Sequence, residues 1–142
     1  HLTLDFFGAV QPQLTACIEA AGDAVVLDEF VLGLREAICW PRQRLWVAQP
    51  AYAPGALLSL VGQLNRQLSV CGFEPERRRY RAHLTLARKA PEIAPVAFQV
   101  DWTVGEFVLA ASCPGHRPRY RVARRWALRA ARTGLRESAN GQ

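Results

Sequence analysis

The 142-residue sequence lacks the local signatures of several large enzyme classes. It contains neither a Gly-rich phosphate-binding loop nor a G-x-S-x-G elbow, which argues against a P-loop protein and an α/β-hydrolase. No run of 18 apolar residues occurs and no signal-peptide pattern precedes His1, so no membrane segment is expected. Half of the residues are hydrophobic, so the chain can bury the core of one domain.

Metal-binding and redox patterns are also missing. Cys17, Cys39, Cys71 and Cys113 form no C-x-x-C pair and show no metal-ligand spacing. Such scattered cysteines predict free, mostly buried thiols in a reducing cytoplasm, although two disulfides remain an open alternative. His116 lies in a turn rich in Pro and Gly without a second ligand, which indicates a surface histidine. Neither a metal nor another cofactor is expected.

Lysine is nearly absent, yet the chain is strongly basic. Only Lys89 among the 18 basic residues is a lysine, and the net charge of +6 points to a polyanionic partner. Two clusters of arginines could form a rim that attracts RNA, with a solvated charged face as the alternative. The first cluster is Arg77, Arg78, Arg79 and Arg81, and the second is Arg117, Arg119, Arg121, Arg124 and Arg125.

One tetrad occurs twice in the sequence. Residues 1–4 and residues 83–86 both read HLTL. Because side chains alternate along a strand, the His and Thr of each copy share one face while both leucines point to the other. An imidazole exchanges protons near neutral pH and a hydroxyl donates to an oxyanion, so two facing copies could act on one phosphate. The alternative for each copy is a half-buried strand with a polar face.

The tetrads and the stretches around them resemble one enzyme family. The pair is similar to the two H-x-[ST]-x motifs of the 2H phosphoesterases. Four longer stretches resemble the bacterial RNA 2′,3′-cyclic phosphodiesterases, also called 2′-5′ RNA ligases: residues 1–10 (HLTLDFFGAV), 44–48 (RLWVA), 83–89 (HLTLARK) and 112–120 (SCPGHRPRY). The family normally has a strand and a helix before the first motif and Pro where this chain has Ala82.

The resemblance implies an α+β fold with two pseudo-symmetric lobes of antiparallel sheet, outer helices and a central cleft that carries both tetrads. We expect residues 1–128 to form this single bilobal domain without the N-terminal strand and helix, and residues 129–142 to form a loosely ordered basic tail. Local patterns predict helices over 12–21 and 56–71, and strands over 1–6, 24–34, 44–49, 82–89, 96–100, 103–111 and 119–128. The strands over 96–100 and 103–111 could be one long strand bent at Asp101 and Trp102.

The resemblance also implies an activity. The expected reaction is metal-independent hydrolysis of an RNA or nucleotide 2′,3′-cyclic phosphate to a 2′-phosphomonoester, with 2′-5′ RNA ligation when an RNA 5′-hydroxyl replaces water. One of His1 and His83 would deprotonate the water, and the other would protonate the departing ribose 3′ oxygen. Thr3 and Thr85 would donate hydrogen bonds to the phosphate oxygens.

Three further residues could complete the site. Arg88 matches an arginine after the second motif and would bind phosphate, but strict alternation places it opposite His83 unless the strand bulges near Ala87. Phe6 and Tyr120 could line the cleft, with packing as the alternative for both. Candidates for base stacking, each with core packing as its alternative, are Phe6, Trp46 and Tyr52.

The expected partner is an RNA or nucleotide that ends in a 2′,3′-cyclic phosphate, bound by a monomer without metal or membrane. Two other functions are open. One is a non-catalytic RNA- or nucleotide-binding module on the same scaffold. The other is a cyclic phosphodiesterase that acts on a small nucleotide such as ADP-ribose 1″,2″-cyclic phosphate.

Overall fold

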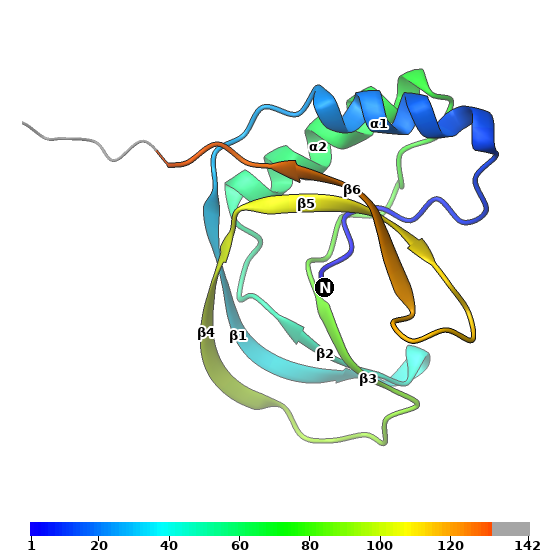
Figure 1. Cartoon of the computed structure of the whole chain (residues 1–142). Helices are drawn as coiled ribbons and strands as arrows, with labels where there is room; N and C mark the ends of the chain where they lie inside the picture. Colours follow the sequence, from blue (N-terminus) through cyan, green and yellow to red (C-terminus); the bar gives the residue numbers. More distant parts are fainter. Residues whose placement is uncertain (132–142) are drawn as a thin grey trace, which may run out of the picture.

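The computed structural model describes residues 1–131 as two antiparallel sheets with two α-helices (Figure 1). In chain order the elements are the 3₁₀ turn η1 (Pro12–Leu14), α1 (Thr15–Asp23), β1 (Phe30–Trp40), the 3₁₀ turn η2 (Pro41–Gln43), β2 (Leu45–Gln49), α2 (Gly55–Val70), β3 (Leu84–Arg88), β4 (Val96–Val104), β5 (Glu106–Ser112) and β6 (Tyr120–Ala127). One sheet has the strand order β3-β2-β1-β4, and the other consists of β5 and β6. The predicted α+β class is therefore confirmed.

The first long strand is shifted relative to its prediction. The expected strand over residues 24–34 begins only at Phe30 and continues to Trp40. Each end of β1 pairs with an end of a neighbouring strand: Phe30 pairs with Val104, the last residue of β4, and Trp40 pairs with Leu45, the first residue of β2. Local alternation predicts that a strand exists, whereas pairing with β2 and β4 decides where it starts and ends.

The predicted stretches over 96–100 and 103–111 are divided at a different residue in the structure. Asp101, where a bend was predicted, lies within β4, and the chain passes from one sheet to the other at Gly105. Asp101 accepts a hydrogen bond from the Arg35 guanidinium of β1 at 2.7 Å. That hydrogen bond holds the pKa of the Asp101 carboxyl below its usual value. The Asp101 side chain therefore reinforces the pairing of β4 with β1.

The main core is built by both sheets and by one face of α2. The apolar stripe of α2 supplies Leu57 and Leu60, which contact Leu32 and Leu34 of β1 and Phe107 of β5. Each of these side chains is at least nine-tenths buried, and such burial of apolar surface is the dominant favourable term in folding. The core therefore holds the two sheets and α2 as one unit.

The two helices pack on each other, which Figure 1 shows on one side of the molecule. Ile18 and Ala21 of α1 meet Leu68 of α2 in a second, smaller apolar cluster. The end of α2 is fixed by Gly72, whose positive φ of 86° suits a residue without a Cβ, and by the Phe73 amide, which donates to the Leu68 carbonyl at 3.2 Å. This turn places Cys71, which lies between the end of α2 and Gly72, beside α1.

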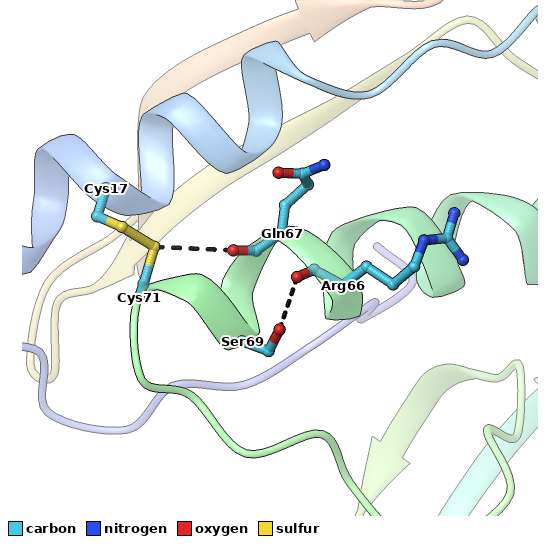
Figure 2. The surroundings of a disulfide bond; sticks show 5 residues. All are labelled: Cys17, Arg66, Gln67, Ser69 and Cys71. Atoms are coloured by element: carbon cyan, nitrogen blue, oxygen red, sulfur yellow. Dashed lines mark hydrogen bonds between the residues drawn. A yellow bond between two sulfur atoms is a disulfide. The ribbon is translucent and has the colours of Figure 1, made fainter.

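A disulfide joins the two helices (Figure 2). Cys17 of α1 is bonded to Cys71, with the two Cα atoms 5.8 Å apart. The expectation of four free thiols is therefore wrong for this pair, while Cys39 and Cys113 are free. The pairing depends on how α1 packs against α2, which the spacing of cysteines along the chain does not encode.

The beginning of the predicted tail is ordered by contacts with the chain ahead of β1. Arg129 forms a parallel bridge with Asp28, and its Nε lies 2.8 Å from the Asp28 carboxylate. The remainder of the predicted tail, residues 132–142, lies outside the described residues. No helix within residues 1–131 is long and apolar enough to cross a membrane. The cytoplasmic location stays a prediction.

One close approach fixes α1 on β6. The Trp126 ring of β6 lies directly over Gly22, so close that a Cβ on Gly22 would overlap it. The ring has little freedom to move, because it stacks on Phe107 with centroids 5.0 Å apart and donates to Asp23 at 2.9 Å. Because Gly22 has no Cβ, α1 can lie this close to the two-stranded sheet.

We expect Gly22→Ala to lower the free energy of unfolding by about 1–3 kcal/mol, because the added methyl group overpacks this contact. Gly62→Ala is the matched control: a Cβ there meets only the Arg66 side chain at 3.6 Å, and helix propensity should raise stability by up to about 1 kcal/mol. Urea unfolding measures both variants. An unchanged midpoint for Gly22→Ala would contradict the described packing of α1 on β6.

Candidate active site

The first tetrad lies beside the second and runs antiparallel to it. Leu2 forms an isolated antiparallel bridge with Leu84, the first residue of β3. Figure 1 shows the N-terminus next to β3, between the two sheets. The predicted strand over residues 1–6 is wrong, because this one bridge replaces the ladder of hydrogen bonds that defines a strand.

The bridge determines which side chains share a face. Residues directly opposite in an antiparallel pair point to the same side, and Leu2 and Leu84 both pack against the main core. Their sequence neighbours therefore point to the other side. The antiparallel register also places His1 opposite Thr85 and Thr3 opposite His83. We call this surface the tetrad face, and it carries His1, Thr3, His83 and Thr85.

The ring of His83 is held in one orientation. Its Nδ1 lies 2.8 Å from the carbonyl oxygen of Arg81. A carbonyl oxygen only accepts hydrogen bonds, so Nδ1 carries the proton and Nε2 is the nitrogen left for proton exchange. The Trp40 ring packs against His83 with centroids 4.5 Å apart, and the Arg81 guanidinium covers Trp40 at 4.5 Å. These contacts fix the orientation of the His83 ring.

His1 connects the two sheets. Its ring meets the ring of Tyr120 edge to face, with centroids 4.8 Å apart and an interplanar angle of 73°. Tyr120 begins β6 in the two-stranded sheet, whereas the neighbour of His1, Leu2, pairs with β3 in the four-stranded sheet. The structure therefore places Tyr120 beside the first tetrad, where the two sheets come together.

Tyr80 holds the first tetrad from the other side. Its hydroxyl donates a hydrogen bond to the carbonyl oxygen of Thr3 at 3.0 Å. Burial raises the pKa of Tyr80 to about 12, so the hydroxyl stays protonated and remains a donor well above neutral pH. Sequence reasoning missed Tyr80, although its position three residues before His83 was a usable signal. It also missed Trp40, for which no signal existed.

A bulge returns Arg88 to the tetrad face. Between Thr85 and Ala87, β3 contains one more residue than the matching part of β2, namely Leu86. The extra residue reverses the alternation, so Arg88 projects to the same side as Thr85 instead of the opposite side. The structure thus contains the bulge that Arg88 needs in order to reach the face of the histidines.

Other predicted residues lie away from the tetrad face. The Phe6 side chain is 81% exposed and lines a surface depression with residues 74–78. Trp46 of β2 faces Ala87, and the bulge puts that pair on the side opposite Thr85. His116 is exposed, and its Nδ1 lies 3.2 Å from the carbonyl oxygen of Pro114 in its own turn, which agrees with a surface histidine.

The two arginine clusters have different surroundings. In the second cluster, Arg124 binds the carboxylates of Asp23 at 2.7 Å and Glu19 at 3.2 Å, and so ties β6 to α1. Arg125 binds Glu106 across the β5–β6 pair. These two arginines therefore support the fold. Three arginines of the first cluster line a groove beside the second tetrad: Arg78, Arg79 and Arg81.

Two antiparallel sheets that meet at a pair of H-x-T tetrads on one face define a phosphoesterase of the 2H class. Comparison with known proteins specifies the family, although no family model matches the chain. The chain is 33% identical over 132 residues to the RNA 2′,3′-cyclic phosphodiesterase of Escherichia coli (strain K12), an alignment that covers 90% of this chain and 75% of that protein. The chain belongs to the RNA 2′,3′-cyclic phosphodiesterase family.

Two further similarities agree with this assignment. The RNA 2′,3′-cyclic phosphodiesterase of Aeropyrum pernix is 32% identical over 92 residues, which are 62% of this chain and 52% of that protein. The crystal structure of E. coli LigT complexed with 3′-AMP matches with a TM-score of 0.80 and 32% identity, over 90% of this chain and 76% of that one. Sequence and fold therefore point to the same family.

We expect Tyr80→Phe to lower the free energy of unfolding at neutral pH by about 0.5–1.5 kcal/mol, because the Thr3 carbonyl loses its hydrogen bond. The pKa of Tyr80 is raised from 10.0 to about 12 in the folded chain, so the hydroxyl stabilises the fold below pH 10 and loses this effect as the pH rises toward 12. The difference between wild type and variant should therefore shrink with rising pH. Urea unfolding at about pH 8 and about pH 11 measures it. A difference that stays constant would contradict the burial of the Tyr80 hydroxyl, and equal stability of both proteins at about pH 8 would contradict the hydrogen bond.

Proposed function

We propose that this chain hydrolyses the 2′,3′-cyclic phosphate at the end of an RNA or of a nucleotide. The observation that carries the proposal is the antiparallel Leu2–Leu84 bridge. Alternation of side chains on either side of this bridge supports a common face for two imidazoles and two hydroxyls. The family name of the E. coli and A. pernix relatives supports the reaction, and the E. coli LigT complex with 3′-AMP supports a nucleoside phosphate as the ligand.

The reaction needs two proton transfers and no redox step. One imidazole takes a proton from a water molecule while the water oxygen bonds to phosphorus. The bond from phosphorus to the ribose 3′ oxygen breaks, and the other imidazole gives its proton to that oxygen. The product is a 2′-phosphomonoester. When an RNA 5′-hydroxyl takes the place of water, the same two transfers form a 2′-5′ linkage.

The remaining groups on the tetrad face stabilise the charge that develops on the phosphate. Thr3 and Thr85 would each donate a hydrogen bond to a non-bridging oxygen. Arg88, which the bulge brings to the same side, would add a positive charge. We propose that the chain acts as a monomer and without a metal ion, because both tetrads come from one chain and the imidazoles supply both proton transfers.

Substitution of His83 tests this assignment. We expect His83→Asn to lower kcat for 2′,3′-cyclic AMP by about 10²- to 10⁴-fold, because one of the two proton transfers is lost. The matched control is His116→Asn, which should leave kcat unchanged because the exposed His116 ring hydrogen-bonds a carbonyl of its own turn. Product is measured with EDTA present. Activity that disappears with EDTA would contradict a metal-independent reaction, and tight RNA binding without turnover would indicate a binding module instead.

The pH profile provides a second test. One imidazole must be neutral and the other protonated, so kcat should pass through a maximum and fall on both sides. In the His83→Asn variant, the residual kcat should fall on at most one side of the pH range. Initial rates between about pH 5 and about pH 9 measure the profile. A wild-type rate that rises steadily over this range would contradict the two-histidine mechanism.

A further inference from the structure

A groove lies beside the segment that precedes β3 and contacts both tetrads. It lies between residues 49–53, which follow β2, and residues 78–82, which precede β3, with Leu58 of α2 at its side. We call it the arginine groove. Among residues 1–131 no acidic side chain lines it, and the proposed mechanism uses none of its side chains.

The inner wall of the arginine groove is in direct contact with the proposed active site. Tyr80, in this wall, donates its hydroxyl hydrogen bond to the Thr3 carbonyl at 3.0 Å. The next residue, Arg81, accepts the hydrogen bond from His83 Nδ1 at 2.8 Å. One wall residue therefore touches each tetrad, so a chain bound in the groove has its end beside the tetrad face.

The charge of the groove fits a phosphate backbone. Arg78, Arg79 and Arg81 line it, and in the described part of the chain only Arg78 has a carboxylate within ion-pair distance. That carboxylate, Glu76, is 3.8 Å away and both side chains are mostly exposed, so it neutralises little of the charge. Positive charge that no carboxylate offsets attracts phosphates and releases their counterions.

An aromatic ring adds a second recognition element. The Tyr52 side chain is 81% exposed although it belongs to the wall of the groove. An exposed ring in a basic groove offers a face on which an unpaired base can stack, whatever the identity of the base. The small residues Ala51 and Ala53 on either side of Tyr52 leave that face accessible.

We propose that the arginine groove binds the nucleotides on the 5′ side of the cyclic phosphate as a single strand. Tyr52 stacks on a base of this strand, and Arg78 and Arg79 contact its phosphates. This inference rests on the proposed function, because it assumes that the cyclic phosphate itself is bound at the tetrad face. It makes a single-stranded oligoribonucleotide a better substrate than a cyclic mononucleotide.

The test compares an oligoribonucleotide ending in a 2′,3′-cyclic phosphate with 2′,3′-cyclic AMP. For Tyr52→Ala, the ratio of kcat/KM on the oligonucleotide to that on cyclic AMP should fall about 5- to 100-fold, and Tyr52→Phe should restore it. Arg79→Gln should lower the same ratio and reduce the salt dependence of oligonucleotide binding by about 0.7 in the logarithmic slope. Arg66→Gln, an exposed arginine on α2 outside the groove, should change neither.

Binding measured separately distinguishes failure of this inference from failure of the proposed function. Fluorescence anisotropy with an oligoribonucleotide that ends in a 2′-phosphate reports the groove without any turnover. Binding that weakens in Tyr52→Ala while neither substrate is hydrolysed would support the groove and overturn the proposed function. The proposed role of the groove would be overturned if Tyr52→Ala hydrolysed cyclic AMP normally with an unchanged ratio of kcat/KM between the two substrates. Equal losses of kcat/KM on both substrates would overturn it too.

Discussion

One backbone bridge, between Leu2 and Leu84, decides the geometry of the proposed active site. Both leucines pack against the main core, so the alternation of side chains sends the histidine and threonine of each tetrad to the opposite face. The antiparallel direction of the bridge matters as much as its existence, because it sets each histidine opposite the threonine of the other tetrad. A pair of short motifs thereby becomes one surface with two proton carriers and two donors.

A single bridge stabilises little by itself, and the surrounding contacts hold it from three directions. Tyr80 binds the backbone of the first tetrad, Tyr120 packs on His1, and Trp40 packs on His83. These residues come from the segment before β3, from β6 and from β1. The proposed site therefore depends on the relative position of the two sheets, which the shared core and the packed helices maintain. The arginine groove uses the same support, because its inner wall contains Tyr80.

Elements with a strong local pattern were predictable from the sequence. The apolar stripe ending at Gly72 predicted α2, and the second tetrad and the stretch around Trp46 predicted β3 and β2. The boundaries of β1 and the single bridge at residues 1–4 were not predictable, because pairing with other strands decides them. For the site, repetition of HLTL pointed to the tetrad residues, whereas Trp40 lies far from both copies in the chain and carries no motif.

The sequence by itself determined the chemical groups and the face on which each tetrad presents them. These properties are local, since they follow from residue type and from the two-residue period of extended backbone. Only the tertiary structure decided that the two faces coincide, that Cys17 meets Cys71 and that the bulge at Leu86 turns Arg88 toward the site. These properties depend on contacts between residues distant in the chain, and packing of the sheets and helices selects those contacts from many that local patterns allow.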